Sequence, residues 1–234
     1  MAERQQIFLF SLLRRLLAGF IILAVPIWLT LTATRLLVSD TYLQFEYNKP
    51  DFPADPYGFT QADRLAYALY AIAYLTNDSD ISFLGNLTFP DGSPMYNSRE
   101  LGHMADVKAV MQVAYTGYGV LSGILLVVGI GLFMTTRRVL FRALRRGAYL
   151  TLALIVGLVV FAALSWDYFF ETFHSLFFAA GTWRFLYSDT LIRLFPERFW
   201  FDAAVTIGVL VVAGAILIIF VTTLVERLLA RREA

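Results

Sequence analysis

The sequence contains no cysteine and few charged residues. Only 16% of its 234 residues are charged, against roughly 25% in an ordinary soluble domain, and 59% are hydrophobic. The absence of cysteine excludes disulfides, a thiol nucleophile, a thiolate metal site and lipidation of the chain itself. The shortage of charge excludes a soluble globular enzyme.

The hydrophobic residues gather in four stretches without a single charge. Each stretch is long enough to cross a hydrocarbon core of about 30 Å as a helix. They cover residues 16–34, 109–136, 147–166 and 203–225. We therefore predict an all-α membrane protein with four transmembrane helices, two extracytoplasmic loops that contain short or interfacial helices, and one integral membrane domain over residues 1–234. Stretch 16–34 is too long for a signal-peptide core, so we expect it to be retained.

Charge is distributed unevenly along the chain. Segments 1–15, 137–146 and 226–234 hold 11 of the 19 basic residues and have a net charge of +8, whereas 35–108 and 167–202 together have a net charge of −7. By the positive-inside rule, both termini are predicted to be cytoplasmic in the cell membrane. Loops 35–108 and 167–202 are then extracytoplasmic.

Two capping signatures organise the first loop. Thr60 with Asp63 predicts a helix over 62–75, and Asn97 with Glu100 predicts that the second membrane helix begins near residue 98. Further along that helix, five glycines predict close approach of neighbouring helices. They are Gly117, Gly119, Gly123, Gly129 and Gly131.

The second loop is rich in aromatic residues. Of the 36 residues from 166 to 201, 14 are aromatic. We expect 165–178 to continue the third membrane helix and 189–195 to form an amphipathic helix that Pro196 ends. The aromatic residues are typical of an anchoring belt, and they also suit an acyl-chain substrate with a polar head. For the acyl chain we expect a wall made by Phe170, Phe173, Phe177 and Trp183.

Both histidines of the chain fall in these loops. His174 shares a helix face of about 60° with Asp167 and Glu171, and His103 shares one of about 120° with Glu100 and Asp106. A carboxylate that accepts a proton from one ring nitrogen leaves the other nitrogen free to act as a base. The pattern indicates acid–base chemistry, although a hydrogen-bonded interfacial histidine without chemistry gives the same pattern.

Motifs for other chemistry are missing. The sequence has no metal-binding H-E-x-x-H, no G-x-S-x-G elbow, no Walker loop and no G-x-G-x-x-G. We therefore expect no bound metal, no serine hydrolase and no nucleotide-dependent enzyme.

Three segments together resemble one bacterial family. They are NSRELGHMADVK at 97–108, the pair Phe173 and His174, and LFPERFW at 194–200. The chain resembles the lipoprotein intramolecular transacylase (Lit) family of four-helix membrane proteins. The resemblance implies an acyltransferase at the outer face of the cytoplasmic membrane, with His103 and His174 as its catalytic pair. Its substrate would be a bacterial lipoprotein whose N-terminal cysteine carries a thioether-linked diacylglyceryl group.

The implied reaction moves the sn-2 acyl chain to the α-amine of that cysteine and gives the lyso form. One histidine acts as general base, or accepts the acyl chain as a transient acyl-imidazole. Asp106 and Glu171 would orient the imidazoles, and Arg99 or backbone N–H groups would face the oxyanion. No cofactor, nucleic acid or obligate protein partner is implied, and membrane lipid surrounds the site. The alternative is a non-catalytic membrane protein that binds lipid or a partner.

Overall fold

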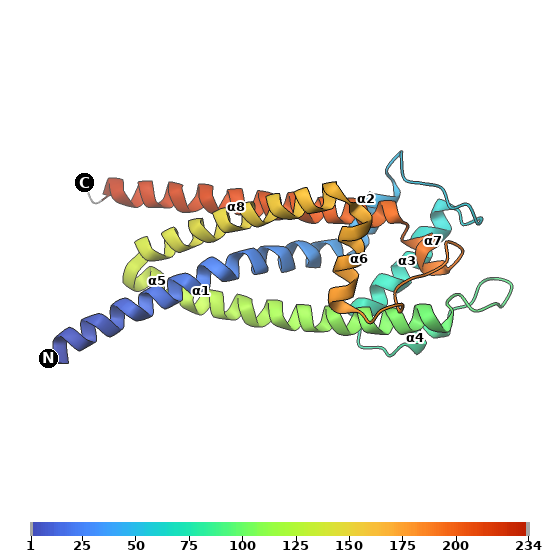
Figure 1. The fold of residues 1–234 in the computed structure, drawn as a ribbon, viewed down its shortest axis with the longest axis horizontal. Helices are drawn as coiled ribbons and strands as arrows, with labels where there is room; N and C mark the ends of the chain where they lie inside the picture. The colour runs from blue at the N-terminus through green and yellow to red at the C-terminus, as the bar shows by residue number, and fades with distance from the viewer. Residues whose placement is uncertain (1, 233–234) are drawn as a thin grey trace. The chain divides into compact units, whose positions relative to one another are not determined.

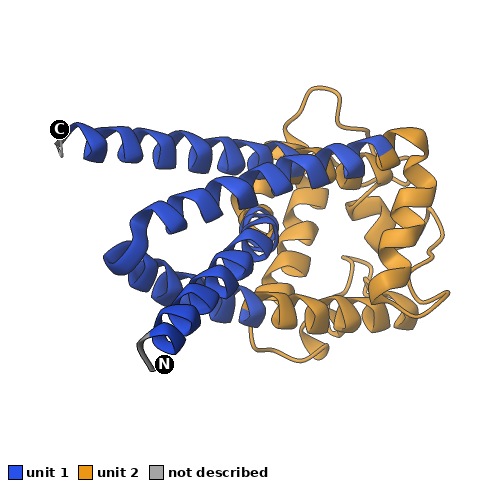
Figure 2. Ribbon diagram, turned by 60° about the vertical axis from the view of Figure 1, so that its left-hand side comes forward, with its two compact units in different colours: residues 1–33, 116–160, 208–234 blue, residues 34–115, 161–207 orange. Residues whose placement is uncertain are grey.

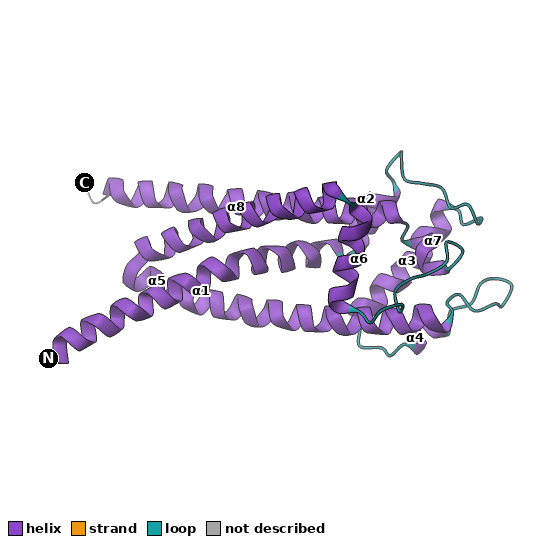
Figure 3. Cartoon of the chain, viewed as in Figure 1, coloured by secondary structure: helices purple, strands orange, loops and turns teal. Residues whose placement is uncertain are grey.

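The computed structural model describes residues 2–232 and consists of helices joined by loops (Figures 1 and 3). No strand occurs among these described residues. The longest helices are α1 (Ala2–Leu37), α5 (Ser98–Leu164) and α8 (Glu197–Arg232). Shorter helices lie between them: α2 (Asp40–Tyr47), α3 (Gln61–Thr76), α4 (Ser82–Gly85), α6 (Trp166–Phe177) and α7 (Thr190–Leu194).

The long helices have the length and composition of membrane spans. Helices α1, α5 and α8 are each apolar enough to cross a bilayer. Helix α5 has 67 residues, roughly three times the thickness of a hydrocarbon core, and its backbone leaves helical geometry at Thr136. Figures 1 and 2 show the chain bending back near this point. The all-α membrane class is confirmed, and the count of four crossings stays a prediction.

The chain divides into two compact units (Figure 2). Unit 1 comprises residues 1–33, 116–160 and 208–234, and unit 2 comprises 34–115 and 161–207. Unit 1 therefore contains most of the apolar helical stretches. Unit 2 contains both histidines and the short helices.

Close helix packing in unit 1 depends on two glycines outside the predicted series. A β-carbon on Gly147 would lie 2.8 Å from Val25 Cβ, and one on Gly214 would lie 2.7 Å from Leu29 Cδ2. By contrast, β-carbons on the five glycines between 117 and 131 would meet no described atom within 4 Å. The prediction for those five was wrong, because glycine spacing does not tell which helix face meets a neighbour.

Helix ends in unit 2 follow the capping signals. Thr60 and Asp63 form a capping box at the start of α3, and Asn97 and Glu100 form one at the start of α5. One boundary differs from its prediction: the third apolar stretch does not continue to residue 178. Ser165 leaves the helical conformation and its side chain accepts a hydrogen bond from Tyr168 N–H, so α6 is a separate helix.

Candidate functional site

The two histidines lie side by side in unit 2. His103 is in the second turn of α5, and His174 is in the last turn of α6. Their ring centroids are 6.4 Å apart and their planes are inclined by 26°. His174 is 8% exposed and His103 is partly buried. The fold thus brings together two residues that are 71 positions apart in the sequence.

Aromatic rings surround both imidazoles. The His174 ring centroid lies 4.1 Å from that of Phe170, 4.7 Å from Trp183 and 5.5 Å from Phe173. The His103 ring lies 4.9 Å from Phe178 and 5.3 Å from Phe185. We call these two histidines and five aromatic residues the histidine cluster.

The sequence-based wall overlaps with the histidine cluster in part. Phe170, Phe173 and Trp183 contact a histidine, whereas the ring of Phe177 lies against Phe173 at 5.1 Å. Phe178 and Phe185 were missed. Aromatic residues are so frequent in this loop that spacing alone does not single them out.

Hydrogen bonds leave particular nitrogen atoms of the cluster without a partner. His174 Nδ1 lies 2.9 Å from the carbonyl oxygen of Phe170, and since a carbonyl only accepts, Nδ1 carries the proton of the neutral ring. Nε2 of His174 therefore keeps its lone pair. His103 Nδ1 and Trp183 Nε1 are buried and have no hydrogen-bond partner among the described residues.

Both imidazoles are held in the neutral form. Burial, supported by the neighbouring His174, lowers the pKa of His103 to about 4, against a smaller opposing effect of Asp106. His103 precedes the predicted membrane-spanning segment 109–136. Burial also lowers the pKa of His174, and the hydrogen bond with the Phe170 carbonyl opposes this shift. At neutral pH each ring is therefore uncharged and keeps the lone pair of one nitrogen atom.

The carboxylates expected to assist the histidines form no hydrogen bond with them among the described residues. Glu171 forms an exposed ion pair with Arg184, and the acceptor for His174 is a backbone carbonyl instead. Asp106 acts on His103 through its charge. Asp167 lies exposed in the first turn of α6.

Glu100 joins two segments of unit 2. It is 1% exposed, and its two oxygens accept hydrogen bonds from Asn97 N–H at 2.8 Å and from Leu191 N–H at 2.7 Å. The side chain that was expected to support His103 therefore connects the start of α5 to α7.

Asp189 is a second connection, and it was missed. Its carboxylate accepts from Arg99 Nη2 at 3.0 Å, from Asn97 Nδ2 at 3.2 Å and from Leu186 N–H at 2.9 Å. The neighbouring Phe185 ring contacts His103, so Asp189 fastens that ring to the first turns of α5. Arg99, expected at the oxyanion, is engaged by Asp189 and lies over the Phe185 ring at 5.7 Å.

A group of charged residues elsewhere in unit 2 also lay outside the sequence-based site. Lys49 Nζ is 2.8 Å from Glu46 Oε2 and 3.0 Å from Asp202 Oδ2, and Glu46 is fully buried. Arg198 donates to Asp202 at 2.8 Å and to Asp51 at 2.6 Å. We call these five residues the ionic cluster. It connects the end of α2 and the loop after it to the first turns of α8.

Metal-ligating side chains are not grouped in the part of the chain that the structure describes. There, no set of three or more histidine, aspartate or glutamate residues is arranged to hold a metal ion.

Known proteins resemble this chain over most of its length. An uncharacterized protein of Aquifex aeolicus (strain VF5) is 26% identical over 222 residues, which are 95% of this chain and all of the relative. A solved structure of the membrane integral lipoprotein intramolecular transacylase Lit from Bacillus cereus has a TM-score of 0.67 at 21% identity, covering 95% of this chain and 98% of that one.

A variant of the Bacillus cereus protein, with alanine in place of one histidine, has a TM-score of 0.77 at 21% identity. The match covers 98% of this chain and all of that one. At such identity the likeness shows the fold alone. The model of the family described as lipoprotein intramolecular transacylase Lit matches residues 19–200, which is more than half of the chain. The chain therefore belongs to the Lit family.

Proposed function

We propose that this protein is a lipoprotein intramolecular transacylase, a membrane-embedded acyltransferase. It moves the sn-2 acyl chain of an S-diacylglyceryl-cysteine lipoprotein to the α-amine of the same cysteine. The observation that carries the proposal is the histidine cluster: two neutral imidazoles 6.4 Å apart, with unpartnered nitrogen atoms and aromatic walls, in a member of the Lit family.

The α-amine attacks the sn-2 carbonyl carbon in this reaction. A C–N bond forms, the ester C–O bond breaks, and the amine proton ends on the sn-2 oxygen, so no cofactor or water is consumed. His174 acts as general base through Nε2, because its Nδ1–H is held by the Phe170 carbonyl. The protonated His174 then gives up this proton, and His103, neutral at the start, relays it to the leaving sn-2 oxygen and is neutral again at the end.

Trp183 donates a hydrogen bond to the oxyanion. Its indole Nε1–H is buried without a partner among residues 2–232, and its ring lies 4.7 Å from that of His174. A buried donor without an acceptor is costly unless a ligand satisfies it. Arg99 is less suited, because it is 47% exposed at its side chain and bound to Asp189.

Helix α6 offers an apolar surface for the acyl chain. Phe173 is 48% exposed, Phe177 is 49% exposed and Leu176 is 74% exposed. Exposed apolar side chains beside a polar reaction centre suit a substrate with a fatty chain and a polar head. Phe173 belongs both to this apolar surface and to the histidine cluster, because its ring also lies 5.5 Å from that of His174.

The reaction is placed on the outer face of the cytoplasmic membrane. This part of the proposal rests on the charge asymmetry, with four crossings, one membrane domain and both termini inside. Ser79, Ser188 and Ala230 are exposed and suit single-cysteine labelling, because the chain has no cysteine of its own. We expect an impermeant thiol reagent to label Ser79→Cys and Ser188→Cys in intact cells, but not Ala230→Cys. Labelling of Ala230→Cys alone would show that the topology is the opposite of the one proposed.

The activity can be tested with purified protein and a synthetic S-diacylglyceryl-cysteine peptide. Transfer within one molecule leaves the mass unchanged, so tandem mass spectrometry must locate the acyl chain. We expect fragments with an N-acyl cysteine and a monoacylglyceryl thioether. Loss of one acyl chain as free fatty acid would indicate a hydrolase, and an unchanged substrate would favour the alternative, a protein that only binds lipid or a partner.

A further inference from the structure

A cavity lined by arginines lies in unit 1, between α1 and the part of α5 that follows Thr136. Its volume is about 310 Å³. Helix α1 contributes Arg14 and Arg15, and α5 contributes Arg142 and Arg146. We call it the arginine cavity. None of its residues belongs to the histidine cluster or to the ionic cluster.

Small residues and one tight contact give the cavity its form. At Gly147 the two helices touch so closely that a β-carbon there would lie 2.8 Å from Val25 Cβ and 3.2 Å from the Ile22 carbonyl oxygen. Further toward the arginines, Ala18 and Ala143 line the space without filling it. The helices therefore touch at Gly147, and the cavity lies before this contact along both helices, among residues 11–22 and 139–146.

The arginines of the cavity are not neutralised by carboxylates. No aspartate or glutamate lines the cavity, and no ion pair involves Arg14, Arg15 or Arg146 in the described residues. Arg142 Nε donates only to the Arg138 carbonyl oxygen, at 3.1 Å. Four guanidinium groups around one space lower the energy of any anion that enters it.

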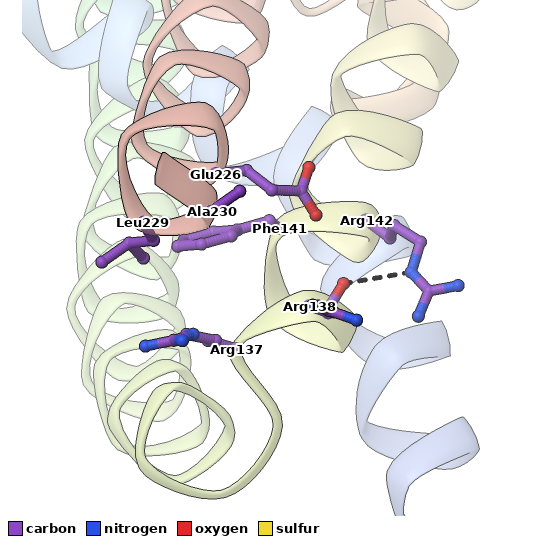
Figure 4. A pocket seen from close by; sticks show the side chains of 7 residues that line it. All are labelled: Arg137, Arg138, Phe141, Arg142, Glu226, Leu229 and Ala230. Carbon is purple, nitrogen blue, oxygen red and sulfur yellow. Dashed lines mark hydrogen bonds between the residues drawn. The ribbon is translucent and has the colours of Figure 1, made fainter. Parts of the chain in front are cut away.

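A neighbouring cavity provides a contrast. It lies between α5 and α8, has a volume of about 460 Å³ and shares Arg142 (Figure 4). Glu226 lies among its arginines, and this carboxylate is also 2.8 Å from Arg145 Nη1. An acidic side chain within the cavity repels a second anion, so the arginine cavity is the better anion site.

The apolar surroundings favour a lipid over a soluble anion. Leu12, Leu13 and Leu16, on the same stretch of α1 as the arginines, are 41%, 51% and 63% exposed. Ile22 lines the cavity next to the contact at Gly147. Arginine pairs well with phosphate oxygens, and basic pockets between membrane helices bind anionic headgroups. We propose that the arginine cavity binds the phosphodiester headgroup of an anionic glycerophospholipid, with an acyl chain along the leucines.

Native mass spectrometry of the purified full chain in detergent tests the proposal, with phosphatidylglycerol and phosphatidylcholine as the added lipids. We expect preferential binding of phosphatidylglycerol. The double variant Arg14→Gln/Arg146→Gln should bind it roughly 25-fold more weakly, from about five-fold per arginine removed. The matched control Arg4→Gln/Arg227→Gln loses the same charge outside the cavity and should change binding less than about two-fold.

Two further variants distinguish a loss of binding caused by misfolding from one caused by the lost charges. Arg14→Lys/Arg146→Lys keeps both charges and should retain most of the binding, whereas Ala18→Leu keeps all arginines and narrows the cavity, so binding should fall. Equal weakening in the control pair, or equal binding of both lipids, would overturn the proposal. Displacement of phosphatidylglycerol by millimolar inorganic phosphate would also overturn it, because the cavity would then be a free-anion site. None of these measurements uses transacylase activity, so the lipid-binding proposal can fail or succeed independently of the proposed function.

Discussion

The histidine cluster and the ionic cluster belong to the same unit but differ in whether an opposite charge compensates their buried polar atoms. In the ionic cluster Lys49 lies within 3.0 Å of two carboxylates, and Arg198 donates to the same Asp202 oxygen as Lys49 and to one oxygen of Asp51. In the histidine cluster His103 Nδ1 and Trp183 Nε1 are buried and have no hydrogen-bond partner in the described part of the chain. Both Glu46 oxygens are also buried without a hydrogen bond among the described residues, but the Lys49 ammonium group compensates their charge. A buried donor without an acceptor, by contrast, costs stability and is suited to bind a substrate. From this difference we infer a structural role for the ionic cluster and a catalytic role for the histidine cluster.

Removing either histidine should have the largest effect on catalysis. We expect His103→Ala and His174→Ala each to lower the rate of acyl transfer at least about 10²-fold, because each removes a proton-transfer group. The double variant should be no slower than the slower single variant, since residues that act as a unit are non-additive. Single-turnover assays on the diacylglyceryl peptide measure this. If the fold-loss in rate of the double variant equals the product of the two single losses, the two histidines act separately.

Removing the central cation of the ionic cluster should affect stability instead. Lys49→Met leaves the buried Glu46 and the nearby Asp202 without their shared partner, and we expect a loss of about 3 kcal/mol in the free energy of unfolding. Thermal unfolding in detergent gives the shift, and turnover per folded molecule should stay near that of the wild type. Arg198→Gln is the control, because its side chain is 43% exposed and should matter less. A catalytic defect at unchanged stability would reverse the assignment.

The indole N–H of Trp183 should matter through the transition state. Trp183→Phe keeps an aromatic ring and removes the donor, so we expect kcat to fall by about 10²-fold while KM changes little. Trp200→Phe is a matched control, since the Trp200 indole N–H already donates to the Phe195 carbonyl oxygen at 3.0 Å. A change confined to KM would mean that Trp183 only contacts the bound substrate and does not stabilise the transition state.

The pH dependence should show the depressed pKa of His103. With that pKa at about 4, His103 is neutral above roughly pH 5, and the rate should rise with pH only as the substrate amine, with a pKa near 8, loses its proton. An additional inflection near 6.5 in a kcat/KM profile would contradict this. Below pH 6.5 His103 binds a proton in the unfolded chain but stays neutral in the folded protein. Protons therefore favour the unfolded state, and the melting temperature should fall as the pH decreases toward 4.

The smallest effect is expected at the exposed ion pair of α6. Glu171→Gln should change the rate less than about three-fold, because Glu171 binds Arg184 in solvent and His174 has another acceptor. Arg184→Gln should behave in the same way. A loss of ten-fold or more in Glu171→Gln alone would return Glu171 to the orienting role that its spacing suggests.

Sequence patterns predicted the local features well. The capping boxes Thr60–Asp63 and Asn97–Glu100 are present, because they depend on residues only three positions apart. Asp189 was missed, because its partners Asn97 and Arg99 lie about 90 positions away. The supposed partnership of Glu171 with His174 had the right helical spacing. Spacing alone does not reveal that Arg184 binds Glu171, or that the main-chain carbonyl four residues before His174 is available as its acceptor.

The acceptor of His174 has a genetic consequence. The atom that fixes its tautomer is the main-chain carbonyl oxygen of Phe170, and every one of the twenty amino acids supplies that atom. No codon change at position 170 can delete it. Where a carboxylate orients a catalytic histidine, one nucleotide substitution can remove the orienting group. In this chain, the backbone of the helix itself fixes the orientation of His174.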